Sequence, residues 1–172
     1  MSRVRKSATE RRASVVAAAL TQFGDSGLDA TSVADIARRA DVSEAYVHTL
    51  FGSKSGLLNS VIAQHTDDMV ALLRSSVGGR PPDMTPTQAI GEVVSRLLHQ
   101  DGGALRRQMH IWGIAYDPAV RLSVQASFKA MWEEIVRLTD SGPEDIRELL
   151  ARVTLTTILA SLDLRDLAGQ QS

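Results

Sequence analysis

The sequence contains no cysteine, which excludes a disulfide framework, a thiol nucleophile and a thiolate site for zinc. It also lacks any apolar run that approaches the roughly 20 residues needed to cross a membrane. Its first six residues, Met1 to Lys6, are basic, but no apolar segment of a secretory signal accompanies them. These absences predict a soluble, cytoplasmic protein without a membrane partner.

Catalytic motifs are missing as well. The four histidines, His48, His65, His99 and His110, do not have the spacing of metal ligands, and the sequence has no glycine-rich phosphate loop or nucleophile motif. The carboxylates are scattered over helical positions that should face solvent. We therefore expect no enzymatic activity, no metal and no cofactor.

What the sequence does contain is the composition of a folded protein, with 44% hydrophobic and 23% charged residues. Apolar residues recur at helical spacing, and no stretch alternates for long as a β-strand does. Capping residues precede several of these segments, and glycine follows them. The sequence predicts an all-α protein of about eight helices, near residues 8–24, 32–40, 44–50, 53–76, 86–100, 104–116, 118–141 and 143–167.

Residues 11–58 contain three short amphipathic segments, and only Ala40-Asp41-Val42 separates the second from the third. Two short helices with so brief a turn are typical of a helix-turn-helix, whose second helix can enter the major groove of DNA. Such turns usually have glycine at the position of Asp41, and aspartate tolerates the left-handed conformation acceptably. This stretch therefore predicts a DNA-reading module.

The third segment has two distinct faces when it is drawn as a helix. Val47, Leu50 and Phe51 cluster on one side and should pack on the first two helices. The other side carries small and hydrogen-bonding side chains, namely Glu44, Ala45, His48 and Thr49, with Tyr46 at the flank. Glu44 can accept a hydrogen bond from cytosine N4, and Thr49 can contact a thymine methyl group or a phosphate.

Charge is distributed unevenly along the chain. Residues 1–56 hold eight Lys/Arg and six Asp/Glu, whereas the remainder holds eleven and fourteen. The first twelve residues carry five basic groups, Arg3, Arg5, Lys6, Arg11 and Arg12. A basic arm of this kind suits a chain that meets a polyanion at one end, although a solvated terminus has the same composition.

Two stretches together resemble the N-terminal domain of TetR-family regulators. They run from Phe23-Gly24 through TSVADIA (31–37) to Val42-Ser43, and then over FGSKSGLL (51–58). The likeness spans residues 11–60 and implies a three-helix DNA-binding domain over residues 1–55. It also implies a helical ligand-binding and dimerisation domain over residues 56–172. A dimer would bind a double-stranded, palindromic DNA operator, usually as a repressor, until a small molecule relieves the binding.

The resemblance implies roles by matched position. Thr31 and Ser32 stand where the family caps its second helix and offers hydroxyl and N–H groups to phosphate, and Ser43 caps the recognition helix. Lys54 stands where the family has a phosphate-contacting lysine at the start of the fourth helix. Each of these residues alone has an ordinary structural explanation as a cap or a solvated lysine, so the prediction depends on their joint spacing.

The recognition helix departs from the family pattern at one position. His48 occupies the place of a tyrosine that usually contacts phosphate or base, and the aromatic ring stands two residues earlier, at Tyr46. Which of these two residues contacts bases is left open. The modest basic charge and Glu44 also keep open an alternative, a helical ligand-binding or protein-interaction module that has lost DNA binding.

The C-terminal part, residues 60–172, has no motif of comparable specificity. The resemblance implies a pocket for an unknown small-molecule effector among the helices after the third, and pockets combine apolar walls with a few polar groups. The candidate ligand-binding residues are His65, Met69, Met109, His110, Trp112 and Tyr116. Every one of them is also compatible with an ordinary core position.

The last two predicted helices, about 118–141 and 143–167, have the features of a dimerisation element. Their apolar surface is wider than a single intramolecular contact needs, which favours a four-helix interface between two copies of the chain. The heptad-like row of the first of these helices is Val124, Phe128, Met131, Ile135 and Leu138. The alternative is that both helices only cover the core.

Overall fold

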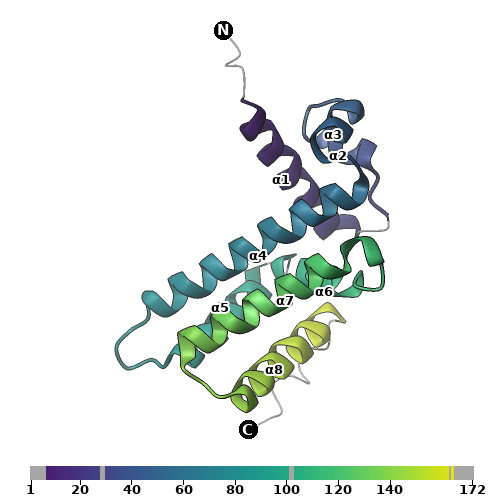
Figure 1. Cartoon of the computed structure of the whole chain (residues 1–172). Helices are drawn as coiled ribbons and strands as arrows, with labels where there is room; N and C mark the ends of the chain where they lie inside the picture. The colour runs from purple at the N-terminus through teal and green to yellow at the C-terminus, as the bar shows by residue number, and fades with distance from the viewer. Residues whose placement is uncertain (1–6, 28–29, 101–102, 163, 165–172) are drawn as a thin grey trace.

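The computed structural model describes residues 7–27, 30–100, 103–162 and 164, so the expectations for Arg3, Arg5 and Lys6 lie outside the described residues. The described part forms eight helices and no strand, which confirms the predicted all-α class (Figure 1). Within it, no helix is long and apolar enough to span a membrane, and no group of His, Asp and Glu is arranged to hold a metal ion. The helices are α1 (Ala8–Ser26), α2 (Val33–Arg39), α3 (Glu44–Phe51), α4 (Lys54–Gly78), α5 (Pro86–Gln100), α6 (Gly103–Gly113), α7 (Pro118–Thr139) and α8 (Pro143–Ser161).

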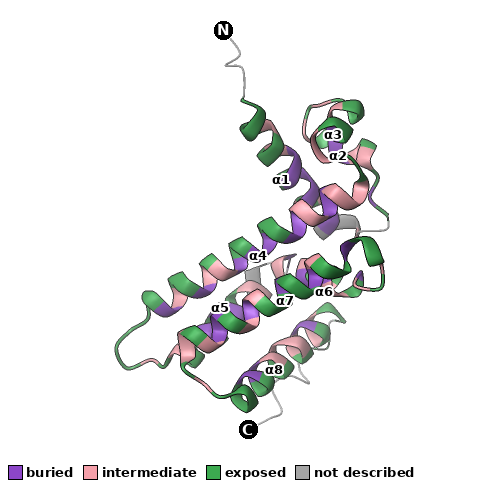
Figure 2. Cartoon of the chain, in the orientation of Figure 1, coloured by how far each residue is buried: buried purple, intermediate pink, exposed green. Residues whose placement is uncertain are grey.

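Helices α1, α2 and α3 form the N-terminal unit at the top of Figure 1. Ser7 begins α1 through a reciprocal capping box with Glu10, whose backbone N–H donates to the Ser7 hydroxyl over 3.1 Å. Val15, Ile36 and Val47, one from each helix, are 0–2% exposed and belong to the same core cluster. Figure 2 shows the buried positions of α1 concentrated where this helix meets α4. The amphipathic spacing of the three segments thus predicted their packing correctly.

Helix α4 connects this unit to the rest of the molecule (Figure 1). Its N-terminal residues Leu57 and Leu58 pack in the cluster of α1–α3, whereas Leu73 and Val77 pack in a second cluster with α5, α7 and α8. One continuous helix of 25 residues therefore belongs to both cores. The N-terminal unit and the C-terminal helices are therefore joined through the packing of this one helix.

Helix α7 lies along α4, and this contact corrects one expectation. Val124, Met131 and Ile135, expected in the dimer seam, are only 4–8% exposed and pack in the cores that α4 shares. The heptad-like row is therefore wrong as a dimer seam at these three positions, because side chains of α4 already cover them. Phe128, at 42% exposed, remains accessible on α7.

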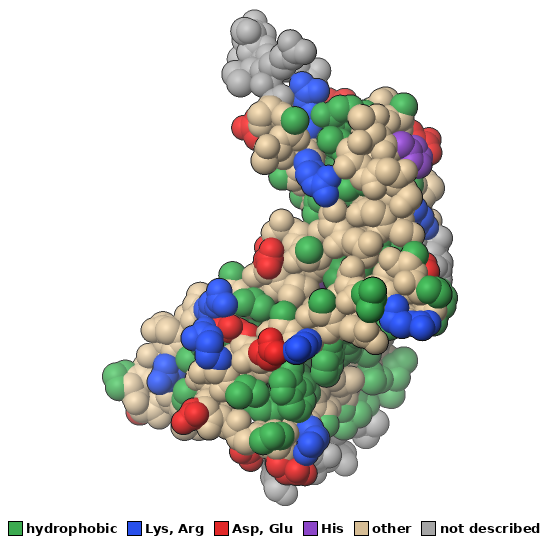
Figure 3. All heavy atoms as spheres, viewed as in Figure 1, with side chains coloured by type: hydrophobic (Ala, Val, Ile, Leu, Met, Phe, Trp, Pro, Cys, Tyr) green, Lys and Arg blue, Asp and Glu red, His purple; other side chains and the backbone are tan. Residues whose placement is uncertain are grey.

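Helix α8 presents an apolar surface of its own. Leu155, Ile158 and Leu162 are 48%, 39% and 61% exposed, and Figure 3 shows hydrophobic side chains gathered over the region of α7 and α8. The helix ends at Ser161 instead of continuing to residue 167, and Leu164 is not helical. Residue 163 and residues 165–167 of the predicted range lie outside the described residues.

Helix α6 is also shorter than expected, since it ends at Gly113 and not at Tyr116. Pro118 begins α7 with Asp117 as its N-cap, and a residue before proline is disfavoured in the helical region. The guanidinium of Arg121 donates to the carbonyls of Ala115 and Tyr116 over 2.9 Å each, which stabilises the turn between the two helices.

Candidate nucleic-acid interface and internal cavity

Helix α3 is the candidate recognition helix. Ser43 caps it by accepting a hydrogen bond from the backbone N–H of Tyr46 over 3.1 Å. Val47 is 2% exposed in the core, and Leu50 and Phe51 pack against the same cluster. The remaining positions are exposed or, for Tyr46, half-buried: Glu44, Ala45, Tyr46, His48 and Thr49. The predicted division into a packing face and an outward polar face is confirmed.

The outward face of α3 carries hydrogen-bonding groups within one helical turn. The Glu44 carboxylate lies 3.8 Å from Nε2 of His48, and both side chains are about half exposed. The Thr49 hydroxyl donates to the Ala45 carbonyl over 2.9 Å, which leaves its oxygen free to accept, and the residue is exposed. Groups of this kind can contact base edges in the major groove.

The turn between α2 and α3 is held by backbone geometry. Asp41 has φ of +55°, in the left-handed region, and the Val42 N–H donates to the Ala37 carbonyl over 3.1 Å. This is the conformation expected at the position where such turns usually have glycine. The turn therefore carries a small conformational cost at Asp41.

Replacing Asp41 by glycine is expected to raise the free energy of unfolding by about 0.5–1 kcal/mol, because glycine adopts a positive φ without a Cβ clash. Urea unfolding of the two proteins measures the difference. Asp140→Gly is a matched variant at the left-handed C-cap of α7, remote from α3, and should give a gain of the same sign. A loss of stability in Asp41→Gly would contradict the strain argument.

The N-terminus of α2 separates two residues for which the resemblance implies one role. Ser32 is exposed, and its hydroxyl oxygen accepts from the Asp35 N–H over 3.1 Å. Hydrogen bonds from Ser32 and Arg38 lower the pKa of the Asp35 carboxyl group below its ordinary value. Thr31 is only 1% exposed, and its hydroxyl donates to the Gly27 carbonyl over 2.7 Å. The expected phosphate contact of the Thr31 hydroxyl is therefore wrong, because this group joins the end of α1 to the start of α2.

The junction of α3 and α4 contains Lys54. Ser53 caps α4 by accepting from the Gly56 N–H over 3.0 Å, which makes Lys54 the first residue of the helix. Lys54 is half-buried there, next to the C-terminus of α3. The residue thus has the predicted position in the chain fold, beside the candidate recognition helix.

Arg12 has a positioning role that sequence reasoning missed. Its guanidinium donates to the Leu50 carbonyl and to the Ser60 hydroxyl, each over 2.8 Å, and lies 4.3 Å from the ring centroid of Phe51. Arg12 therefore ties α1 to the end of α3 and to α4. The partners are 38 and 48 residues away, so no local pattern could have indicated them. Arg11, its neighbour, lies over the ring of Tyr46 at 5.7 Å.

A cavity of about 60 Å³ lies among α4, α5, α6, α7 and α8. Met69 and Trp112, two of the six ligand candidates, line it. Trp112 packs edge-to-face on Phe128 with 5.7 Å between centroids, and Phe128 stacks on Trp132 at 6.4 Å. The structure thus brings two of the predicted residues into one aromatic-walled space.

His65 is hydrogen-bonded to Gln108, and Gln108 lines this cavity. Nε2 of His65, a residue only 2% exposed, is 3.1 Å from Oε1 of Gln108. Burial, followed by the charge of Arg107, lowers the pKa of His65 to about 4, so the ring is neutral at neutral pH. Sequence reasoning missed Gln108, because α6 also contains Arg106, Arg107 and His110 and one more polar residue gives no signal there.

The other three ligand candidates do not line the cavity. Met109 is half-buried and His110 is exposed, because their positions on α6 turn them to other sides of the helix. Tyr116 is 67% exposed in the turn after α6, since the helix ends before it. The predictions for these three residues are wrong for this cavity.

The N-terminal helices match a described protein family. Residues 15–61 match the model for "Bacterial regulatory proteins, tetR family". The HTH-type transcriptional regulator BetI of Rhizobium meliloti (strain 1021) is 40% identical over 74 residues, which cover 41% of this chain and 36% of that protein. The HTH-type transcriptional activator FasR of Mycolicibacterium smegmatis is 27% identical over 152 residues, which cover 87% of this chain and 68% of that protein.

The match extends to the fold of the whole chain. The solved structure of Salmonella enterica GusR superposes with a TM-score of 0.73 at 16% identity, covering 96% of this chain and 90% of that one. The chain spans from about a third to about two thirds of the length of the curated relatives it matches, 36% for BetI and 68% for FasR. Residues 15–61, which hold the helix-turn-helix, thus match the tetR family of bacterial regulatory proteins, and the whole chain shares the arrangement of helices of the solved GusR structure.

Proposed function

We propose that this chain is a sequence-specific DNA-binding transcriptional regulator, with residues 1–55 as the DNA-binding domain and residues 56–172 as the ligand-binding and dimerisation domain. The observation that carries the proposal is the orientation of α3. Val47 anchors this helix in the core at 2% exposed, while the polar face opposite it is open to solvent. A capped helix held in this way can enter the major groove.

Contacts with DNA divide into two kinds. Ser32 at the start of α2 and Lys54 at the start of α4 would contact phosphates, together with the basic residues of the N-terminal arm, Arg3, Arg5 and Lys6. Base edges would be read by the outward face of α3, Glu44, Ala45, Tyr46, His48 and Thr49. Phosphate contacts supply affinity that depends on salt, and base contacts supply the preference for one sequence.

The regulator would act as a dimer on a palindromic operator, because one protomer presents one reading helix. The exposed apolar residues Leu155 and Ile158 of α8 and Leu162 directly after it, with Phe128 of α7, support a second copy of this chain as their partner. This surface involves α8 more than α7, since α4 covers most of the apolar row of α7.

An effector would change DNA binding through α4. A small molecule that contacts the portion of α4 near His65 and Met69 can tilt this helix and so alter the separation of the two α3 helices in a dimer. The shift in free energy between the DNA-binding and the non-binding arrangement of the dimer equals the difference between the free energies with which the effector binds these two arrangements. We propose repression as the outcome on transcription, and a promoter-reporter assay distinguishes it from the activation that the name of the FasR relative indicates for that protein.

The experiment that tests the function is the selection of bound duplexes from a randomised DNA library at fixed salt, followed by the salt dependence of the affinity for the selected sequence. A palindrome with a steep decrease of affinity with salt supports the proposal. Weak binding to every duplex without a common motif would contradict it and favour a protein-interaction module, a function with which the acidic Glu44 on the reading face is compatible.

Three substitutions test the division of roles. Lys54→Ala is expected to weaken binding to all duplexes about equally and to reduce the salt slope by about 1. Tyr46→Ala and Thr49→Ala are expected to cost about 1–3 kcal/mol on the selected operator and much less on random DNA. Lys129→Ala, on an exposed lysine of α7, is the matched control and should change neither affinity. Equal effects of all three variants on operator and random DNA would overturn the assignment.

A further inference from the structure

Glu44 and His48 place an acceptor and a potential donor side by side on the outward face of α3. They lie one helical turn apart, and Oε1 of Glu44 is 3.8 Å from Nε2 of His48. This distance is too long for a hydrogen bond, so neither atom is taken up by the other. The side chains are 54% and 50% exposed. Figure 3 shows a histidine at the surface of the N-terminal unit, and His48 is the only histidine of α1, α2 and α3.

The fold determines where this pair lies. Val47, at 2% exposed in the core, fixes the rotation of α3 about its axis, and the Ser43 cap makes Glu44 the first residue of the helix. Ala45, next to Glu44, is exposed and ends at its methyl group, so no long side chain at this position obstructs a close approach to a base edge. The pair can therefore reach base edges when α3 enters the major groove.

The carboxylate of Glu44 discriminates among the four bases by repulsion as well as by attraction. An ionised carboxylate has only acceptor atoms. In the major groove guanine presents the acceptors N7 and O6, thymine presents O4, and adenine has the acceptor N7 next to its N6 amino group. Cytosine presents the donor N4–H₂ without an acceptor on the same edge. Cytosine is therefore the base that a carboxylate at this position fits best.

His48 complements the other base of the same pair. Its Nε2 donates when it carries a proton, as in the imidazolium ion and in one of the two neutral tautomers. The guanine paired with cytosine offers O6 and N7 as acceptors. Cytosine N4 and guanine O6 share a Watson–Crick hydrogen bond and so lie about 3 Å apart. This separation is close to the 3.8 Å between the Glu44 and His48 atoms.

We propose that Glu44 and His48 together read one C·G base pair in each half-site of the operator, with Glu44 accepting from cytosine N4 and His48 donating to O6 or N7 of the paired guanine. In a dimer, the two-fold axis repeats this contact in the second half-site. The proposal rests on the proposed function of the chain as a sequence-specific DNA-binding protein. It assigns a base contact to His48 and joins it to that of Glu44 at one position, which the sequence left open.

The test is selection from one randomised DNA library at fixed salt, carried out with the wild type and with variants. In the wild type, one position of each half-site should prefer C·G over every other base pair by about tenfold. Glu44→Gln should change the preference at that position to A·T, because an amide accepts from adenine N6 and donates to N7. His48→Ala should lower the preference for C·G about threefold at the same position and leave the other positions unchanged.

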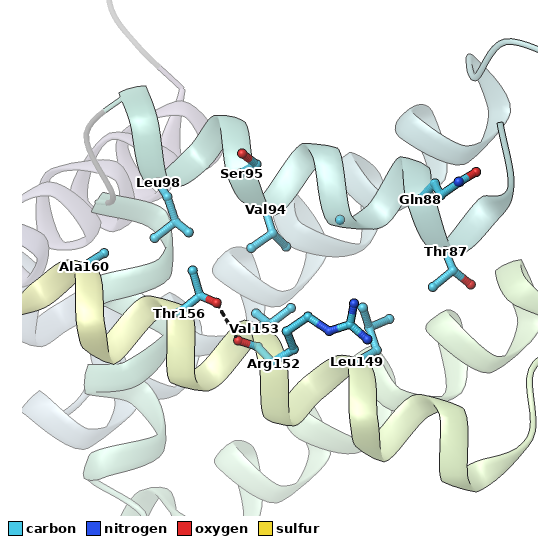
Figure 4. A pocket seen from close by; sticks show the side chains of 11 residues that line it. Thr87, Gln88, Val94, Ser95, Leu98, Leu149, Arg152, Val153, Thr156 and Ala160 are labelled. Carbon is cyan, nitrogen blue, oxygen red and sulfur yellow. Dashed lines mark hydrogen bonds between the residues drawn. The ribbon is translucent and has the colours of Figure 1, made fainter. Parts of the chain in front are cut away.

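The matched control is Glu148→Gln. Glu148 forms the same kind of exposed pair across one helical turn, with Arg152 of α8 at 2.9 Å. Figure 4 shows Arg152 at the groove of about 410 Å³ between α5 and α8, and Figure 1 shows α8 at the opposite end of the molecule from α3. This variant should keep the wild-type preference at every position. Each preference is a ratio of two affinities of one protein, so a smaller folded fraction in a variant does not change it.

A modified duplex tests the contact of Glu44 at a single atom. Replacing the cytosine at the identified position by 2-pyrimidinone removes the N4 amino group. This replacement should weaken binding of the wild type about tenfold more than binding of Glu44→Ala, which has no carboxylate to lose the contact. An equal loss in both proteins would contradict the contact with N4.

The outcomes separate the proposal from the function on which it rests. The proposal is overturned if Glu44→Gln and His48→Ala change the preference at different positions, if either leaves it unchanged, or if the affected position does not prefer C·G in the wild type. It is also overturned if both variants weaken binding to all duplexes equally, as a pair that only stabilises the helix would do. Failure of the wild type to select any operator would instead contradict the proposed function, and this proposal with it.

Discussion

Gly56→Ala is expected to lower the free energy of unfolding by about 3 kcal/mol, although alanine is normally the better helix former. A Cβ atom on Gly56 would lie 2.1 Å from the carbonyl oxygen of Phe51 and 3.2 Å from its carbonyl carbon. Both are backbone atoms, so no side-chain rotation relieves the overlap. The end of α3 has to move away from α4, and this breaks the contacts that Arg12 makes with Leu50 and Ser60.

Urea unfolding measures the loss of stability, and binding to the selected operator measures the displacement of α3 at a temperature where the variant is folded. The control is Gly78→Ala in the last turn of the same helix, where a Cβ meets nothing within 4 Å. That variant should be neutral or gain up to about 0.5 kcal/mol. Wild-type stability of Gly56→Ala would mean that the α3–α4 junction is not as close as the structure has it.

Glu134→Gln is expected to cost about 2 kcal/mol of stability at neutral pH and to remove part of the dependence of stability on pH. The Glu134 side chain is 8% exposed, and its carboxylate accepts from Nε and Nη2 of Arg74 over 2.9 and 3.0 Å and from Arg137. These bonds join α4 to α7 next to the second core cluster. The two arginines are more than half exposed, which limits the loss to an amount well below that of a fully buried pair.

The direction of the pH dependence follows from the pKa of Glu134. Hydrogen bonds from Arg74 and then Arg137 lower this pKa from 4.5 to about 2. The folded state therefore binds the proton less tightly than the unfolded state, so the contribution is complete above about pH 5 and is lost as pH falls toward 2. The difference in unfolding free energy between wild type and Glu134→Gln should shrink over this range.

Urea unfolding at intervals from pH 7 to pH 2 gives that difference. Glu133→Gln is the control, because Glu133 is exposed and its pair with Lys129 on the surface of α7 should contribute less than about 0.5 kcal/mol. A difference between wild type and Glu134→Gln that stays constant with pH would contradict the ionic origin of the contribution.

Features that depend on neighbouring residues were predicted well. Ser43 caps α3 and Ser32 caps α2 as the spacing indicated, and Asp41 adopts the left-handed turn. The outward face of α3 also follows from its periodicity, because a helix turns by a constant angle per residue. The end of α6 was predicted three residues too late, although Pro118 and the contacts of Arg121 with Ala115 and Tyr116 are local in sequence.

Features that depend on a partner far along the chain were missed or assigned wrongly. Thr31 and Ser32 have the same hydroxyl chemistry and each has its partner within four residues, so only the burial of Thr31 in the folded chain, at 1% exposed, separates the two. The sequence places Arg12 in a basic N-terminal arm, whereas in the structure its guanidinium donates to the Leu50 carbonyl and the Ser60 hydroxyl. In the sequence, the apolar row of α7 is compatible with packing on a second copy of the chain and with packing on the core. In the structure, most of this row packs in the cores that α4 shares.

By itself, the sequence determined the helical class, the order of the helices and the outward polar face of α3, because caps, periodicity and short turns act over a few residues. The tertiary structure alone decided which apolar faces remain exposed and which side chains line the cavity. Met69 of α4, Trp112 of α6 and Val153 of α8 line one cavity only because helices from distant parts of the chain pack together. Whether a side chain is buried depends on the helices that pack around it, and the sequence of a single helix does not specify those neighbours.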